Sequence, residues 1–138
     1  ITLSTNKIID YTVDTGIGLV NYGTTNIAFS PNLIAGGVFS YQPISALQLS
    51  LLNKYVGNQF AGNFDTEITK LKSYNVVDFN ANYEIKPKSI FQSIVFSGLV
   101  NNILNVKYVS NAYLYGDSLI SYYPQAGTNF LFGLTLKF

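Results

Sequence analysis

The last ten residues of the chain alternate strictly between apolar and mostly polar side chains. The apolar positions are Phe130, Phe132, Leu134, Leu136 and Phe138, and the positions between them are Asn129, Leu131, Gly133, Thr135 and Lys137. Successive side chains on a β-strand point to opposite faces, so one face of this strand is wholly apolar and the other is mixed. An apolar strand at a chain end is an aggregation hazard in water. The pattern therefore predicts a strand whose apolar face needs a lipid or protein partner.

The composition extends this prediction to the whole chain. The 138 residues suffice for one domain, and they are 48% hydrophobic, 15% aromatic and only 11% charged. Soluble domains carry about 25% charged residues, so a fully solvated surface is not expected. No run of about 18 apolar residues is present to form a transmembrane helix. High apolarity without such a run is typical of membrane strands, in which apolar and polar residues alternate.

Several chemistries lack the residues that they require. The chain has no Cys, His, Met or Trp, so disulfides, the common transition-metal ligands and the usual near-neutral general base are missing. No Gly-x-Ser-x-Gly elbow, glycine-rich phosphate loop or Asp-x-Asp-x-Asp-Gly calcium loop occurs, although Asp10 and Asp14 lie near each other. The net charge of +1 gives no basis for nucleic-acid binding. We expect no enzyme and no catalytic, cofactor or metal residues.

Six strand-like segments are separated by connections of unequal length. The expected strands are a weak one at 1–8, and clearer ones at 33–41, 47–55, 77–85, 94–100 and 129–138. The expected connections are a loop at 10–32, a tight turn at 42–45, a long loop at 56–74, a second turn at 86–89 and a long connection at 101–128. Short turns alternating with long loops are typical of up-and-down outer-membrane barrels. The sequence predicts an all-β fold of about six antiparallel up-and-down strands that form part of a large transmembrane β-barrel.

A soluble β-sandwich binding module is the main alternative, because an apolar strand face can also pack on a second sheet. Nearly every expected strand keeps one apolar face, and aromatic side chains occur near strand ends. Tyr41, Tyr83 and Phe138 would lie near one membrane interface and Tyr55 near the other. Aromatic girdles of this kind favour the barrel.

Four short motifs occur in a recognisable order. They are YVGNQF at 55–60, YNVVDF at 74–79, LVNNILNVKY at 99–108 and YPQAGTNF at 123–130. They resemble YVGxQ, Y-x-V-x-D, V-x-N-L-F-N-x-x-Y and Y-P-Q-A-G-R-N-F of TonB-dependent outer-membrane receptors of the Bacteroidetes type. Ile103-Leu104 replaces Leu-Phe, and Thr128 stands where Arg is common. The whole segment 1–138 resembles the C-terminal barrel portion of that family, most closely from Tyr55 onward.

The terminal strand resembles the signal that the barrel-assembly machinery reads in this class, polar-x-Gly-x-x-apolar-x-aromatic. Gly133, Leu136 and Phe138 match the pattern, whereas Leu131 occupies the polar position. The resemblance assigns an assembly role to six residues of the strand: Phe130, Phe132, Gly133, Leu134, Leu136 and Phe138. A barrel fragment captured as a substrate of that machinery is a further alternative.

The resemblance also implies a function, a location and partners. The family forms an outer-membrane barrel of about twenty-two strands around an N-terminal plug. It imports a nutrient such as a siderophore, metal chelate, glycan or peptide. The implied partners are outer-membrane lipid, the rest of the barrel and plug, TonB through the N-terminal part, the barrel-assembly machinery and a surface lipoprotein. About six strands cannot close a membrane barrel, which needs eight or more. We therefore expect a processed or partial chain, as the start at Ile1 without Met also indicates.

The remaining candidate residues fall into three groups. Lys54, Asp78, Glu84 and Lys86 are expected to point into the polar barrel interior. Loop residues able to contact a glycan or peptide, or to anchor loops at the membrane surface, are Asp65, Glu67, Asp117, Tyr113, Tyr115, Tyr122 and Tyr123. Asn101, Asn102 and Asn105 are expected to form a structural turn, because Asn tolerates tight backbone geometry and bonds its own backbone.

Overall fold

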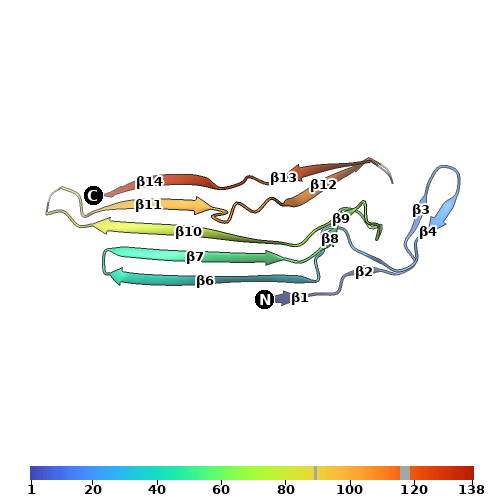
Figure 1. Cartoon of the computed structure of the whole chain (residues 1–138), viewed down its shortest axis with the longest axis horizontal. Helices are drawn as coiled ribbons and strands as arrows, with labels where there is room; N and C mark the ends of the chain where they lie inside the picture. The colour runs from blue at the N-terminus through green and yellow to red at the C-terminus, as the bar shows by residue number, and fades with distance from the viewer. Residues whose placement is uncertain (89, 116–118) are drawn as a thin grey trace. The chain divides into compact units, whose positions relative to one another are not determined.

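A computed structural model describes residues 1–88, 90–115 and 119–138, and every regular element in these ranges is a β-strand (Figure 1). The strands are β1 (Thr2–Leu3), β2 (Lys7–Ile8), β3 (Thr12–Asp14), β4 (Leu19–Asn21), β5 (Thr25–Asn26), β6 (Leu33–Ile44), β7 (Leu47–Val56), β8 (Gln59–Phe60), β9 (Lys70–Leu71), β10 (Tyr74–Ile85), β11 (Ser93–Asn101), β12 (Val109–Tyr115), β13 (Leu119–Pro124) and β14 (Asn129–Lys137). No helix in these ranges is long and apolar enough to cross a membrane. The predicted all-β, antiparallel up-and-down fold is confirmed.

The main sheet has six strands in the order β1-β6-β7-β10-β11-β14. Its long strands follow one another along the chain and lie side by side (Figure 1), as in an up-and-down meander. β6 ends at Ile44 and β10 at Ile85, at the same end of the sheet as Lys137 of β14, and only short connections follow these two strands. Backbone bonds from Glu84 N to Ala46 O and from Gln92 N to Lys137 O, both 2.8 Å, hold that end together. The long connections 57–73 and 102–128 leave from the opposite end.

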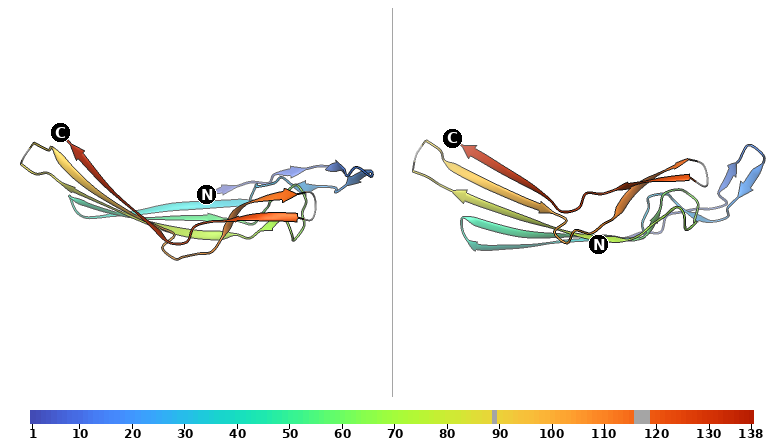
Figure 2. Two further views of the ribbon diagram at one scale, coloured as in Figure 1. Left: turned by 90° about the horizontal axis from the view of Figure 1, so that it is seen from above. Right: turned by 45° about the horizontal axis from the view of Figure 1, so that its top comes forward.

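The chain divides into two compact units, which we describe separately. Unit 1 contains residues 1–35, 55–74 and 107–125, and unit 2 contains residues 36–54, 75–106 and 126–138. Unit 2 holds β11, β14 and most of β6, β7 and β10. Its strands all belong to the main sheet, and they form a single twisted layer (Figure 2).

The register of unit 2 gathers apolar side chains on one face of this layer. Four successive rungs across β10, β11 and β14 are Phe79–Val100–Phe130, Ala81–Gly98–Phe132, Tyr83–Phe96–Leu134 and Ile85–Ile94–Leu136. Residues paired across antiparallel strands lie on the same face, so all twelve positions form one continuous surface, which we call the apolar face. The apolar residues, which occur at every second position of each strand, thus lie beside the apolar residues of the neighbouring strands.

Two side-chain hydrogen bonds show which residues of β7 and β6 lie on the apolar face. Asn53 Nδ2 donates to Asn75 Oδ1 at 2.8 Å, which puts the odd-numbered residues of β7 on the apolar face. Ser40 and Ser50 share a hydrogen bond of 2.9 Å on the opposite face, which leaves Phe39 and Tyr41 on the apolar face. All five long strands therefore present their predicted apolar side to the same surface.

The opposite face of unit 2 is mixed and carries the polar contacts. Ser97 Oγ donates to Asn82 Oδ1 at 2.8 Å, and Asn82 Nδ2 donates to Asn80 Oδ1 at 2.6 Å. Asn101 pairs with Asn129 across β11 and β14 at 2.8 Å. We call this surface the polar face.

Unit 1 contains the hydrophobic core and four small two-stranded sheets. Ala61, Leu71 and Ala112 are buried together, and Val109, Leu114 and Ile120 pack against them. The small sheets pair β12 with β13, β2 with β5, β3 with β4 and β8 with β9. The segments 10–32, 56–74 and 101–128, predicted as loops, therefore contain short paired strands.

Two predicted boundaries are wrong. The tight turn expected at 42–45 lies at Ser45–Ala46, because β6 continues through Pro43 to Ile44. Along the outer side of β6 only Leu33 and Ile34 pair with β1, and proline is tolerated at an otherwise unpaired edge. The expected strand at 1–8 is two short strands, since Ser4 leaves the ladder and bonds Asn32 O and Pro31 O. Ser89 of the second predicted turn lies outside the described residues.

Candidate functional site

The terminal strand β14 combines an exposed apolar side with an edge position. Phe130 is 64% exposed, Phe132 86% and Leu134 59%. β14 is last in the sheet order, so no strand within the described ranges pairs with its outer edge. Phe138 follows β14, and its ring lies 5.0 Å from that of Phe91. Gly133 pairs with Ser97 on the polar face, so the six predicted assembly residues do not share one face.

The exposure of the apolar face extends over the whole of unit 2. Its exposed members include Phe39, Tyr41, Leu51, Tyr83, Ile85 and Phe96. Val76 is the one buried hydrophobic residue of unit 2 among those that the structure describes, and the other four lie in unit 1. Unit 2 thus has an apolar surface in place of an apolar core.

The predicted interior residues lie on or beside the polar face. Lys54 and Asp78 line one groove of about 560 Å³, and Glu84 lines another of about 240 Å³ with Asn82 and Lys137. Asp78 Oδ1 also accepts a bond of 2.7 Å from Asn102 N. Lys86 Nζ lies 3.8 Å from Glu84 Oε2.

The predicted asparagine turn is confirmed for Asn102 and Asn105, whereas Asn101 is the last residue of β11 and pairs with Asn129. Asn102 and Asn105 have φ angles of 49° and 52°, in the left-handed region that Asn tolerates. The Asn102 side chain is buried: its Oδ1 accepts from Val106 N at 2.9 Å, and its Nδ2 donates to Val106 O at 2.9 Å and Ala126 O at 3.3 Å. Thr128 Oγ1 donates to Asn102 O at 2.8 Å. These contacts join the end of β11 to the segment that enters β14.

The predicted loop residues serve several separate contacts. Asp65 accepts bonds from the backbone and side chain of Asn26, and Glu67 pairs with Lys70 at 3.0 Å. Asp14 Oδ1 accepts from Gly16 N in the β3–β4 turn. No group of three or more carboxylates that could hold a metal occurs in the described part of the chain. Asp117 lies outside the described residues.

The four loop tyrosines divide between two faces of the β12–β13 hairpin. Tyr122 is paired with Ala112 on the side of the core, and its hydroxyl donates to Ile68 O at 3.0 Å. Tyr113 and Tyr115 lie on the other side, half exposed, with ring centroids 4.7 Å apart. Tyr123 pairs with Asn111 and shares that side. The hairpin therefore separates Tyr122, which is hydrogen-bonded to Ile68 and 47% exposed, from the three tyrosines on its other side.

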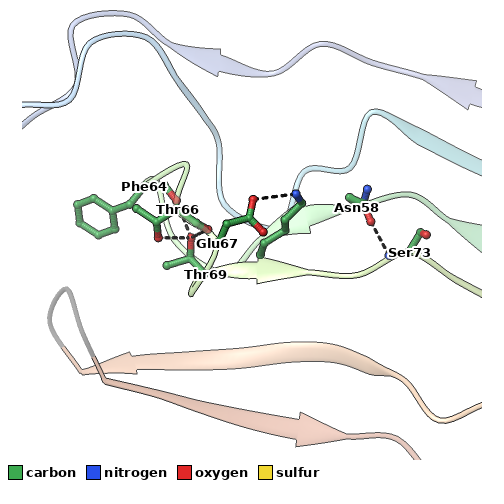
Figure 3. A network of polar contacts seen from close by, with 7 residues as sticks. Asn58, Phe64, Thr66, Glu67, Thr69 and Ser73 are labelled. Atoms are coloured by element: carbon green, nitrogen blue, oxygen red, sulfur yellow. Dashed lines mark hydrogen bonds and ion pairs between the residues drawn. The ribbon is translucent and has the colours of Figure 1, made fainter.

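Thr69 organises the 63–69 loop, as Figure 3 shows. It is 1% exposed, and its hydroxyl lies 2.6 Å from the carbonyl oxygen of Phe64 and 3.0 Å from that of Thr66. Its own carbonyl accepts a bond of 2.7 Å from Ala61 N. Asn58 Oδ1 accepts from Ser73 N at 2.7 Å at the other end of the β8–β9 hairpin.

Replacing Thr69 with Val is expected to destabilise unit 1 by about 1–2 kcal/mol, because the carbonyls of Phe64 and Thr66 lose the donor of the buried Thr69 while the volume is kept. Urea unfolding in detergent micelles measures the change. Thr12→Val is the control: its exposed hydroxyl donates to Asp10 O, and its removal should cost less than about 0.5 kcal/mol. Equal effects of the two substitutions would contradict the assigned role of Thr69.

One feature of unit 1 was not predicted from the sequence. A cavity of about 440 Å³ is lined by Lys70, Leu71, Lys72, Ser73, Lys107, Tyr108, Val109, Tyr122 and Pro124. The lining comes from three separate stretches of sequence, and no local spacing signals their meeting.

No protein-family model matches the chain, and neither a curated protein nor a solved structure does. A functional interpretation therefore depends on the geometry described above and on the motif resemblance.

Proposed function

We propose that the chain supplies the last strands of the transmembrane β-barrel of a TonB-dependent outer-membrane receptor that imports a nutrient. The observation that carries the proposal is the exposed apolar face of unit 2, opposite a polar face. Keeping a large apolar side chain in water costs about 1.5–3 kcal/mol relative to burial. Contact with lipid tails removes this cost for the whole face at once.

The sheet edges support a barrel over an isolated membrane sheet. β14 and most of β6 have unpaired outer edges among the described residues, and a bilayer offers no water to satisfy them. Membrane strands therefore occur in closed barrels, which have at least eight strands. The five strands of unit 2 need further strands on both sides, and these would come from the remainder of the receptor. In this arrangement the polar face, with Lys54 and Asp78, lines the interior beside the plug.

The choice of receptor class is supported by the ordered motifs and by the connections. The motif at 99–108 coincides with the asparagine turn, in which Asn102 joins β11 to the entry of β14. Short connections at one end and long ones at the other match periplasmic turns and extracellular loops. The same proposal includes four partners of the chain. They are a plug, TonB, which supplies energy through the N-terminal part of the receptor, a surface lipoprotein, and the barrel-assembly machinery, which inserts the barrel. The nutrient is a siderophore, metal chelate, glycan or peptide.

The dependence of the chain on an amphiphile tests the proposal. We expect the purified chain to remain dispersed with its β-structure in detergent or lipid and to sediment as aggregates when the amphiphile is removed. Analytical ultracentrifugation with circular dichroism measures both states. A folded monomer in plain buffer would contradict the proposal and favour the soluble β-sandwich binding module.

A further inference from the structure

The cavity of unit 1 concentrates positive charge. Three of the eight cationic residues of the chain, Lys70, Lys72 and Lys107, line it. No Asp or Glu is among its lining residues. Lys70 pairs with Glu67, whose side chain is 87% exposed, but neither Lys72 nor Lys107 pairs with a carboxylate anywhere in the described ranges. The charges of Lys72 and Lys107, which are both exposed residues, therefore have no carboxylate partner in the described ranges.

The other walls of the cavity are apolar or aromatic and are held in place. The Tyr108 ring stacks on Tyr74 with centroids 4.2 Å apart. The Tyr122 hydroxyl is fixed by its bond to Ile68 O, and Val109 is paired with Pro124 in the β12–β13 ladder. Walls fixed by other contacts need little ordering when a ligand binds, which lowers the entropic cost of binding.

We propose that this cavity binds a small, compact anion with two or more carboxylate or phosphate groups. Its volume of about 440 Å³ falls in the range of small-molecule sites, about 300–1,000 Å³. Lysine ammonium groups pair with both oxyanion types, and the tyrosine and aliphatic walls accommodate the body of the ligand. The inference that this anion is the solute imported by a receptor rests on the proposed function. Binding of the anion itself requires only unit 1.

Calorimetric titration of the full chain in a non-ionic detergent at low ionic strength tests the proposal, with citrate and pyrophosphate as probes. We expect saturable binding of one molecule of at least one probe. Binding of citrate alone or pyrophosphate alone would support the site and identify the preferred oxyanion. The double variant Lys72→Gln/Lys107→Gln should bind about tenfold more weakly, since each exposed charge pair contributes modestly. Added salt should weaken binding to the original chain.

The charge-matched control is Lys7→Gln/Lys88→Gln, which removes two positive charges from residues that do not line the cavity. It should bind the probe as the original chain does. An equal loss in both double variants, no saturable binding of either probe, or binding unaffected by salt would each overturn the proposal. Circular dichroism checks that the variants fold. If the chain fails to bind either probe but its sheet still faces lipid, the anion site is overturned and the proposed membrane role remains intact.

Discussion

Replacing Phe132 with Lys is expected to abolish most of the stable insertion of the chain into lipid vesicles. Phe132 is 86% exposed on the apolar face, and it lies next to the midpoint of β14. A lysine on the lipid side at mid-depth costs about 2–4 kcal/mol, which corresponds to a loss of about 30- to 1,000-fold in the insertion equilibrium. Flotation of vesicles with bound protein measures the fraction inserted.

Leu131→Lys is the matched control for this substitution. Leu131 is adjacent in sequence, 56% exposed, and paired with Leu99 on the polar face. In the proposed barrel the same charge would meet the polar interior, and it should leave insertion within about threefold of the original value. Equal losses for the two variants would show that β14 does not separate a lipid side from a polar side.

Asn102→Ala is expected to destabilise the folded chain by about 2–4 kcal/mol. The substitution leaves the partly buried Val106 N–H without its acceptor and removes the donor to Val106 O and Ala126 O. It also places alanine in the left-handed region, at φ 49°, without the local side-chain hydrogen bonds by which Asn tolerates this backbone conformation. Urea unfolding of the chain in micelles measures the loss.

Two substitutions separate the causes of that loss. Asn102→Gly relieves the backbone but not the lost hydrogen bonds, so it should be about 1 kcal/mol less destabilising than Asn102→Ala. Asn105→Gly should be nearly neutral, because Asn105 is exposed and its side chain accepts only one long bond, 3.4 Å from Thr128 N. If Asn102→Ala proved as mild as Asn105→Gly, the turn would not hold β11 to β14 as described.

The long strands could be predicted because their signal is local. Alternation such as that of β10, from Val77 to Ile85, fixes strand identity and face without knowledge of any partner. The unequal connections then led to the correct strand order, since neighbours joined by short turns pair directly. The boundary error at Pro43 arose because proline also marks turns, and only the pairing shows that the outer edge of β6 tolerates it.

Unit 1 was less predictable because its pairings connect distant residues. Lys7 pairs with Asn26 in strands of two residues, which are too short to show a period, and Val109 pairs with Pro124 from a distant part of the sequence. Asn102 was recognised as a turn residue, but its bond to Ala126 depends on the sheet that brings the two segments together. The three lysines of the cavity come from two segments that are distant in sequence, Lys70 and Lys72 from one and Lys107 from the other, so their common charge was visible only in three dimensions.

The most direct test of the central claim uses the absence of Trp from the chain, which makes any introduced Trp the sole reporter. Phe132→Trp and Leu134→Trp place it on the apolar face, and Leu131→Trp and Thr135→Trp place it on the polar face. Quenching by lipids brominated on their acyl chains is then measured in vesicles. We predict strong quenching at 132 and 134 and weak quenching at 131 and 135. Equal quenching at all four positions would contradict a sheet with one face toward lipid.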